Sequence, residues 1–100
     1  MKKADVLTSP AAEQDIDEIV GYLLLDDPNA ALSFLDELED AKRQLSDFPE
    51  SGSMTRTERF AKKGYRFMVV LGYLALYTFQ DGTVRIMRVI HARRNYGAML

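Results

Sequence analysis

The sequence predicts an α+β fold in which a hairpin of two helices packs on an antiparallel sheet. Three observations predict it: helix-start signals with apolar residues at helical spacing in residues 9–49, strand-like segments in residues 65–91, and short connections between those segments. With a short strand before the first helix, the order is β-α-α-β-β-β, and that strand should join a sheet edge. One hundred residues suit a single domain, residues 1–100.

The first half of the chain is predicted to hold residues 3–8 as a strand, followed by two helices. Ser9 is a suitable N-cap before Pro10 at the first helical position, and Asp27 with Pro28 repeats this pattern. Apolar residues then recur at helical spacing up to about residue 49. They are Ile16, Ile19, Val20 and Leu23 in the first helix and Ala31, Phe34, Leu35, Leu38, Ala41, Leu45 and Phe48 in the second.

The second half is predicted to be an antiparallel meander. Residues 49–64 show little periodicity and are interpreted as a basic loop or an irregular edge. Residues 65–71, 73–79 and 83–91 are rich in β-branched and aromatic side chains, as strands are. Asp81-Gly82 between the last two is a strong hairpin signal.

Strict alternation assigns the side chains of the last two strands to two faces. Val84, Ile86, Arg88 and Ile90 would share one side of the last strand, and Arg85, Met87, Val89 and His91 the other. Both sides of the preceding strand are also apolar. One face should meet the helices, which leaves apolar and aromatic surface beside arginines on the other and favours a partner site there. The alternative is that the protein's own loops cover that face.

Charge is distributed unevenly along the chain. Residues 1–53 carry four basic and thirteen acidic groups, a net of −9, whereas residues 54–100 carry nine basic and two acidic groups, a net of +7. This asymmetry predicts a basic face available to nucleic acid or to an acidic protein partner. Two oppositely charged, solvated faces are the simpler explanation. Asp15, Asp17 and Glu18 are interpreted as partners of the helix macrodipole on a solvated face.

Composition excludes several classes of protein. The chain has no cysteine, which removes disulfides, thiolate zinc sites and cysteine nucleophiles and fits a reducing cytoplasm. We expect no signal peptide and no segment near the roughly 18 apolar residues of a membrane span. A single histidine, and no glycine loop that cradles phosphate, argue against a metal site and a nucleotide site.

The segment RVIHARRNY, residues 88–96, concentrates chemistry at the end of the last strand. His91 is a candidate general base, Arg93 and Arg94 can hold a phosphate in bidentate fashion, and Tyr96 can stack on a base or donate a proton. Together these groups would suffice for a metal-free ribonuclease that activates a ribose 2′-hydroxyl. A structural histidine beside solvated arginines explains the same residues more simply.

Nearly the full length resembles the RelE/ParE superfamily of bacterial type II toxins. The resemblance lies in the helix opening LTSPAAEQDIDEIVGYL, the second helix PNAALSFLDELEDAKRQLSDFPESG, the strands GYRFMVV and GYLALYTFQDGTVRIMRV, and the ending IHARRNY. It implies the fold predicted above, a cytoplasmic setting, and a cognate antitoxin that wraps over the toxin. No cofactor or metal is expected.

The superfamily has a RelE-like branch, which cuts mRNA on the ribosome, and a ParE-like branch, which poisons DNA gyrase. The ribonucleases commonly open the middle strand with glycine, tyrosine and a catalytic arginine, but this chain has Gly72, Tyr73 and Leu74. The long DIDEIVGYL helix opening and the short ending look ParE-like. The resemblance therefore favours a gyrase inhibitor without catalysis, with a ribosome-dependent mRNA interferase as the alternative.

The resemblance also implies which residues act. In the favoured case the target-binding residues, shared with an acidic antitoxin tail, are Arg66, Arg88, His91, Arg93, Arg94 and Tyr96. In the ribonuclease case the catalytic residues are His91, Arg93 and Tyr96.

Overall fold

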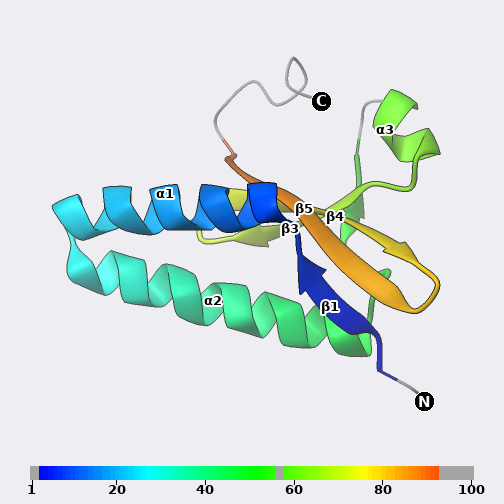
Figure 1. Cartoon of the computed structure of the whole chain (residues 1–100), viewed down its shortest axis with the longest axis horizontal. Coiled ribbons are helices and arrows are strands. Elements are labelled where there is room, and N and C mark those ends of the chain that lie inside the picture. The colour runs from blue at the N-terminus through cyan, green and yellow to red at the C-terminus, as the bar shows by residue number, and fades with distance from the viewer. Residues whose placement is uncertain (1–2, 56–57, 93–100) are drawn as a thin grey trace.

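The structure is a computed structural model that describes residues 3–55 and 58–92, with the backbone alone at residue 60. Its helices are α1 (Pro10–Asp26), α2 (Pro28–Asp47) and α3 (Glu58–Lys62). Its strands are β1 (Asp5–Thr8), β2 (Ser53–Met54), β3 (Arg66–Val70), β4 (Tyr73–Gln80) and β5 (Thr83–His91). Figure 1 shows α1 and α2 lying side by side along the sheet, with their connecting turn at one end of the molecule.

The strands form one sheet in the order β1-β5-β4-β3-β2. This confirms the predicted α+β fold and the edge position of the first strand. The sheet is mixed rather than antiparallel, because β1 runs parallel to β5 and the other neighbours are antiparallel. The long helical crossover lets β1 take this direction. The segment predicted as a basic loop or irregular edge contains β2 and α3, which are too short to show a periodic pattern.

The predicted helix caps are confirmed. The Ser9 side chain accepts a hydrogen bond from the Ala12 N–H at 3.0 Å, and Pro10 occupies the first turn of α1. The Asp27 carboxylate accepts from the Asn29 N–H at 3.0 Å at the start of α2. The Asp27 N–H also donates to Leu23 O at 2.8 Å, so one residue ends α1 and begins α2. This double use makes the turn between the helices tight.

The main core lies between the helical hairpin and one face of the sheet. Its most deeply buried large side chains include Phe34, Leu45, Val70, Tyr77, Val84 and Ile86. The Tyr77 hydroxyl accepts a hydrogen bond from the Gly52 N–H at 2.9 Å. A Cβ at Gly52 would lie 2.4 Å from that hydroxyl oxygen, so the close approach requires glycine.

A bulge in β5 changes which side chains reach this core. Arg88 pairs with Leu76, and Ile86 pairs with Tyr77, the next residue of β4. Met87 therefore lies between them as one extra residue on β5. Strict alternation is therefore wrong beyond this point, because each later side chain is shifted to the other face. Val89 packs in the main core, and Arg88 does not.

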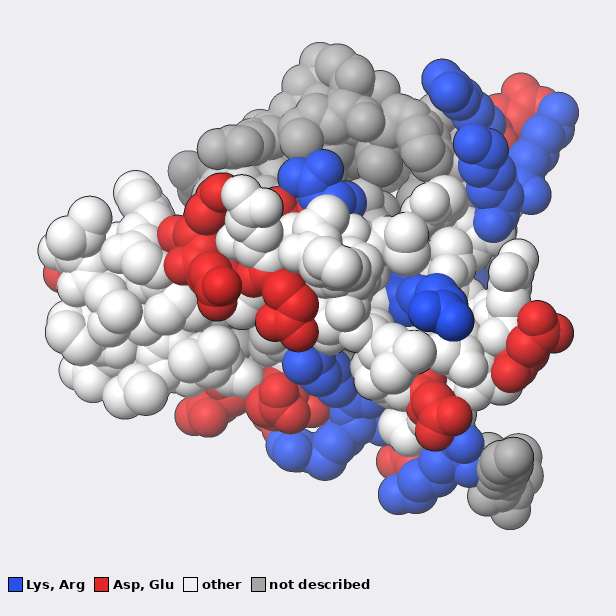
Figure 2. Space-filling model, viewed as in Figure 1, with Lys and Arg blue, Asp and Glu red and all other residues white. Residues whose placement is uncertain are grey.

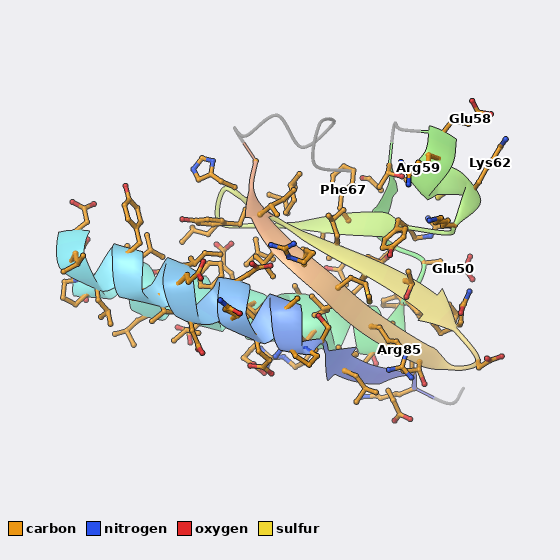
Figure 3. The ribbon with its side chains drawn as sticks, turned by 45° about the horizontal axis from the view of Figure 1, so that its top comes forward. Glu50, Glu58, Arg59, Lys62, Phe67 and Arg85 are labelled. Atoms are coloured by element: carbon orange, nitrogen blue, oxygen red, sulfur yellow. The ribbon has the colours of Figure 1, made fainter. Side chains whose placement is uncertain are left out.

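The opposite face of the sheet carries a second cluster, formed by Leu74, Leu76 and Ile90 with Phe67 packed against it. In Figure 3, Phe67 projects from β3 away from the long helices. The expectation of an exposed apolar surface is wrong for the three buried members, which are 2–6% exposed. Val69 faces the same way as Leu74 and is exposed.

Two tight turns connect β3, β4 and β5. Asp81 and Gly82 both have positive φ, which confirms the predicted β4–β5 hairpin. Leu71 and Gly72 form an equivalent turn between β3 and β4, although leucine rarely adopts this conformation. In the part of the chain that the structure describes, no helix combines the length and apolar character needed to span a bilayer.

Candidate functional site

The end of β5 borders a cleft of about 440 Å³ between α1 and the sheet. Asp15, Glu18 and Tyr22 line it from α1, Tyr73 lines it from β4, and β5 contributes residues 88–91. The cleft therefore brings carboxylates, a guanidinium, an imidazole and two phenol rings to one place. It opens where β1 has ended and α1 runs beside the last residues of β5.

Asp15 fixes this arrangement through three hydrogen bonds. Its carboxylate accepts from Arg88 Nε at 2.7 Å and Arg88 Nη2 at 3.0 Å, which makes a bidentate ion pair. The same carboxylate accepts from the backbone N–H of Val89 at 2.9 Å, a donor that no neighbouring strand satisfies. The Asp15 side chain is only 12% exposed. The prediction that Asp15 lies on a solvated helix face is therefore wrong.

A signal for Asp15 was present in the sequence. It precedes Ile19 by four residues, so it lies on the border of the apolar stripe of α1 rather than opposite it. The sequence could not show that β1 would stop short of the second half of β5. That open strand edge is what makes the carboxylate necessary.

Arg88 is engaged by Asp15 but still reaches solvent. Hydrogen bonding to Asp15 and the charge of that carboxylate raise the pKa of Arg88 further above its already high ordinary value. Its side chain is 49% exposed. A phosphate or carboxylate of a partner can therefore meet Arg88, but only in competition with Asp15.

His91 is positioned by aromatic packing. Its ring lies edge-on to Tyr73, with ring centroids 5.1 Å apart and planes at 76°. Tyr73 in turn packs edge-on against Phe34 of α2 at 5.3 Å. This row of rings ties the end of β5 to the core and leaves His91 half-buried at the border of the cleft.

Arg66 lies apart from this cleft. Its Nη1 donates to Glu50 O at 3.2 Å and Gly52 O at 3.0 Å, and it pairs with the Glu50 carboxylate. Arg66 is in register with Tyr77 of β4, whereas His91 is in register with Tyr73. Tyr77 and Tyr73 are four residues apart on β4, so these two positions lie roughly 13 Å apart along the strand. Arg66 thus holds the segment that follows α2.

The structure brings together two of the six predicted target-binding residues, Arg88 and His91, at the cleft. Arg93, Arg94 and Tyr96 lie outside the described residues. The residues that sequence reasoning did not assign to the site are Asp15 and Tyr73, which position Arg88 and His91 respectively.

Surface charge follows the asymmetry seen in the sequence. In Figure 2 acidic side chains gather over the helices, and a group of basic side chains projects at the opposite end of the molecule. Figure 3 places Arg59 and Lys62 there, on α3, with Glu58 beside them. Lys62 pairs with Glu58 at 3.1 Å. Asp15 and Glu18 of the acidic region line the cleft at the end of β5.

Comparison with known proteins identifies the family. A family model described as the ParE toxin of the type II toxin–antitoxin system parDE matches residues 6–96. The chain belongs to the ParE toxin family. No curated protein matches this chain.

Two solved structures share its fold. One, from the chromosomal ParDE toxin–antitoxin system of Pseudomonas aeruginosa, is 18% identical with a TM-score of 0.70, covering 91% of this chain and 98% of that one. The other, from the RelBE2 toxin–antitoxin complex of Mycobacterium tuberculosis, is 26% identical with a TM-score of 0.64, covering 91% and 93%. The resemblance to the RelE/ParE superfamily seen in the sequence is confirmed.

Proposed function

We propose that this ParE family toxin inhibits DNA gyrase, thereby blocking replication and arresting growth, and that a cognate antitoxin neutralises it. The match of the ParE family model over residues 6–96 carries this proposal. The structural similarity to members of two toxin–antitoxin systems supports an antitoxin partner.

Leu74 supports a target other than RNA. It occupies the position at which the ribonuclease branch commonly has a catalytic arginine, and it is 5% exposed beside Leu76 and Ile90. Cleavage of RNA without a metal needs several cations and a base that converge on one phosphate. An apolar, buried side chain supplies none of this stabilisation, so binding is the better supported mode of action.

The proposed target-binding residues include two at the cleft and three that follow them in the sequence. Arg88 and His91 border the cleft, and Arg93, Arg94 and Tyr96 follow in the sequence. Guanidinium groups and a tyrosine suit the phosphates and bases of gyrase-bound DNA or acidic side chains of gyrase itself. Arg66 is the least supported of the six, because it already binds the segment after α2.

A RelE-like mRNA interferase is the second candidate. The similarity to the RelBE2 structure favours it, and so does the location of His91 beside Arg88 at a cleft. In this case His91 would accept the proton of the ribose 2′-hydroxyl as its oxygen attacks the phosphorus, and Arg93 would stabilise the phosphorane. The bond to the 5′-oxygen would then break, and this oxygen would leave with a proton donated by Tyr96.

A supercoiling assay with purified gyrase, ATP and relaxed plasmid tests the proposal. We expect this protein to prevent supercoiling or to accumulate cleaved DNA, and we expect the antitoxin to reverse the effect. Full supercoiling at high toxin concentration would overturn it and direct attention to the ribosome.

Two sets of variants locate the activity. Arg93→Ala with Arg94→Ala should abolish growth arrest and gyrase inhibition, because the proposed contacts are lost. Arg59→Ala with Lys62→Ala removes the same charge from α3 and should leave both intact. Equal loss in the two sets would indicate that total charge, rather than the end of the chain, determines toxicity.

His91→Ala separates the two modes of action. Loss of a general base should reduce an RNA cleavage rate by roughly 10²–10⁴. Loss of one binding contact should raise the toxin concentration needed for gyrase inhibition by about ten-fold or less. Single-turnover RNA cleavage on ribosomes and gyrase titration, run on the same preparations, distinguish these outcomes.

A further inference from the structure

The turn between α1 and α2 carries a group of exposed apolar side chains, here named the hairpin-tip surface. Its members are Tyr22, Leu24, Leu25, Leu32 and Leu35. Leu25 is 90% exposed and Tyr22 is 68% exposed. In Figure 2 this end of the molecule is largely free of charged side chains and is bordered by acidic ones.

These side chains are not needed to hold the hairpin on the sheet. The core faces of the two helices are already formed by other residues, including Ile16 and Ile19 on α1 and Phe34 and Leu38 on α2. Leu25 and Leu32 point away from that core, as their exposure shows. A cluster of large exposed apolar side chains with polar surroundings is typical of a protein–protein contact.

Charge restricts what can bind there. Residues 10–41 contain ten acidic residues and no lysine, arginine or histidine. Asp17, Asp26 and Asp36 are exposed and form no ion pair with any residue that the structure describes. Such a surface repels nucleic acid and anionic lipid, and attracts basic protein segments. A second copy docking tip to tip would bring like charges together, which is unfavourable.

We propose that a basic amphipathic helix of the antitoxin packs on the hairpin-tip surface. Its apolar residues, spaced at i, i+3, i+4 and i+7, would cover the leucines, and its lysines or arginines would face Asp17 and Asp36. This inference rests on the proposed function, since the antitoxin is the occupant. This antitoxin helix would be basic, whereas an antitoxin segment that binds the basic end of the chain would be acidic.

This location separates neutralisation from toxicity. Leu25 and Leu32 belong to the helical hairpin, whereas the proposed gyrase-binding residues belong to the end of β5, to the residues after it and, for Arg66, to β3. Variants of the hairpin tip should therefore remain toxic while escaping the antitoxin. Tyr22 is the exception, because it also lines the cleft beside His91, and it is left unchanged in the test.

The test measures the affinity of the purified cognate antitoxin for the full-length toxin by calorimetry. Leu25→Ser with Leu32→Ser should weaken binding by about ten-fold or more, because central apolar contacts dominate interface energy. Phe48→Ser with Met54→Ser, which changes exposed apolar residues away from the tip, should alter affinity by less than about three-fold. Unchanged melting temperatures establish that all variants are folded.

A second pair of variants tests the charge of the partner. Asp17→Asn with Asp36→Asn should weaken binding and reduce its dependence on salt, because fewer ion pairs form. Asp5→Asn with Asp81→Asn removes two charges elsewhere and should leave the salt dependence unchanged.

Each outcome is decisive. Antitoxin binding that is unaffected by the tip variants, or equally weakened by the control variants, would overturn the inference and leave the proposed function standing. An antitoxin that does not bind the unmodified toxin would instead refute the proposed function, and the inference with it. The expected result is that the tip variants still inhibit gyrase and that the antitoxin no longer reverses this inhibition.

Discussion

The two halves of β5 differ in how their outer edge is closed. Residues 83–86 pair with β1 on one side and β4 on the other, so strands satisfy their backbone groups. Beyond Ile86, β1 has ended, and side chains take over. The Ser9 hydroxyl donates to Met87 O at 2.9 Å, and the Asp15 carboxylate accepts from the Val89 N–H.

This difference explains where the cleft lies. Had β1 continued, a strand would occupy the space beside the second half of β5, and its side chains would be part of the core. Side-chain closure instead leaves room for Arg88 and His91 to reach the surface. The first half of β5 therefore serves stability, and the second half presents the candidate site.

The first half should be the more sensitive to loss of apolar volume. Ile86 is 1% exposed, so Ile86→Ala should lower the free energy of unfolding by about 2–5 kcal/mol. Arg85 on the same half is exposed, and Arg85→Ala should change the free energy of unfolding by less than about 0.5 kcal/mol. Urea denaturation measures both. Similar values for the two variants would contradict the assignment of this half to the core.

The second half should depend on Asp15. Asp15→Ala leaves the Val89 N–H without its acceptor and should cost about 1–3 kcal/mol of unfolding free energy. Arg88→Ala keeps that bond and loses only a half-exposed ion pair, so it should cost less than about 1 kcal/mol. Hydrogen exchange should show a faster Val89 amide in the first variant only. A larger loss with Arg88→Ala would mean that the ion pair, not edge closure, holds the strand.

Tyr77 lies opposite the boundary between the two halves, in register with Ile86. Tyr77→Phe removes the hydroxyl that accepts from the Gly52 N–H and should cost about 1 kcal/mol at neutral pH. Denaturation at pH 7 compares the variant with the unmodified protein. No difference would indicate that the Gly52 amide finds another acceptor.

The same residue predicts a pH dependence. Burial raises the pKa of Tyr77 in the folded protein above the ordinary value of 10.0. The unfolded state therefore loses this proton first as pH rises, which favours unfolding. The advantage of tyrosine over phenylalanine should be complete below about pH 10 and should shrink above it. An advantage that grows with pH above this point would refute the assignment.

The sequence predicted more of the fold than of the site. Periodicity and caps were sufficient for α1 and α2, because Ser9, Asp27 and the apolar stripes act locally. The parallel direction of β1 and the bulge at Met87 depend on pairing between residues distant in sequence, which no local pattern encodes.

The site required the same long-range information. Arg88 and His91 were predicted from their residue types and from the resemblance to the toxin superfamily, but their partners were not. Asp15 approaches Arg88 across 73 positions of sequence, and Tyr73 positions His91 from the neighbouring strand. The close contact of Gly52 with Tyr77 was likewise invisible, since a glycine in a loop has many possible reasons.

The smallest expected effect concerns the turn next to the second half of β5. Leu71 has φ of 46°, a conformation that costs a leucine about 1 kcal/mol or more, and its N–H donates to the Glu37 carboxylate at 2.9 Å. Leu71→Asn keeps this donor and tolerates the conformation, so it should stabilise the protein by about 0.5–1 kcal/mol. The melting temperature should rise by roughly 2–6 °C.

Leu71→Val is the matched control, since a β-branched residue suits positive φ least and should lower the melting temperature. The gain from asparagine should also be local. The Ala92 N–H donates to Gly72 O at 3.0 Å, so a better turn should slow amide exchange at the end of β5 and leave residues 83–86 unchanged. A uniform slowing along β5 would mean that both halves open together, and the division of the strand into a stabilising half and a half that presents the site would then be wrong.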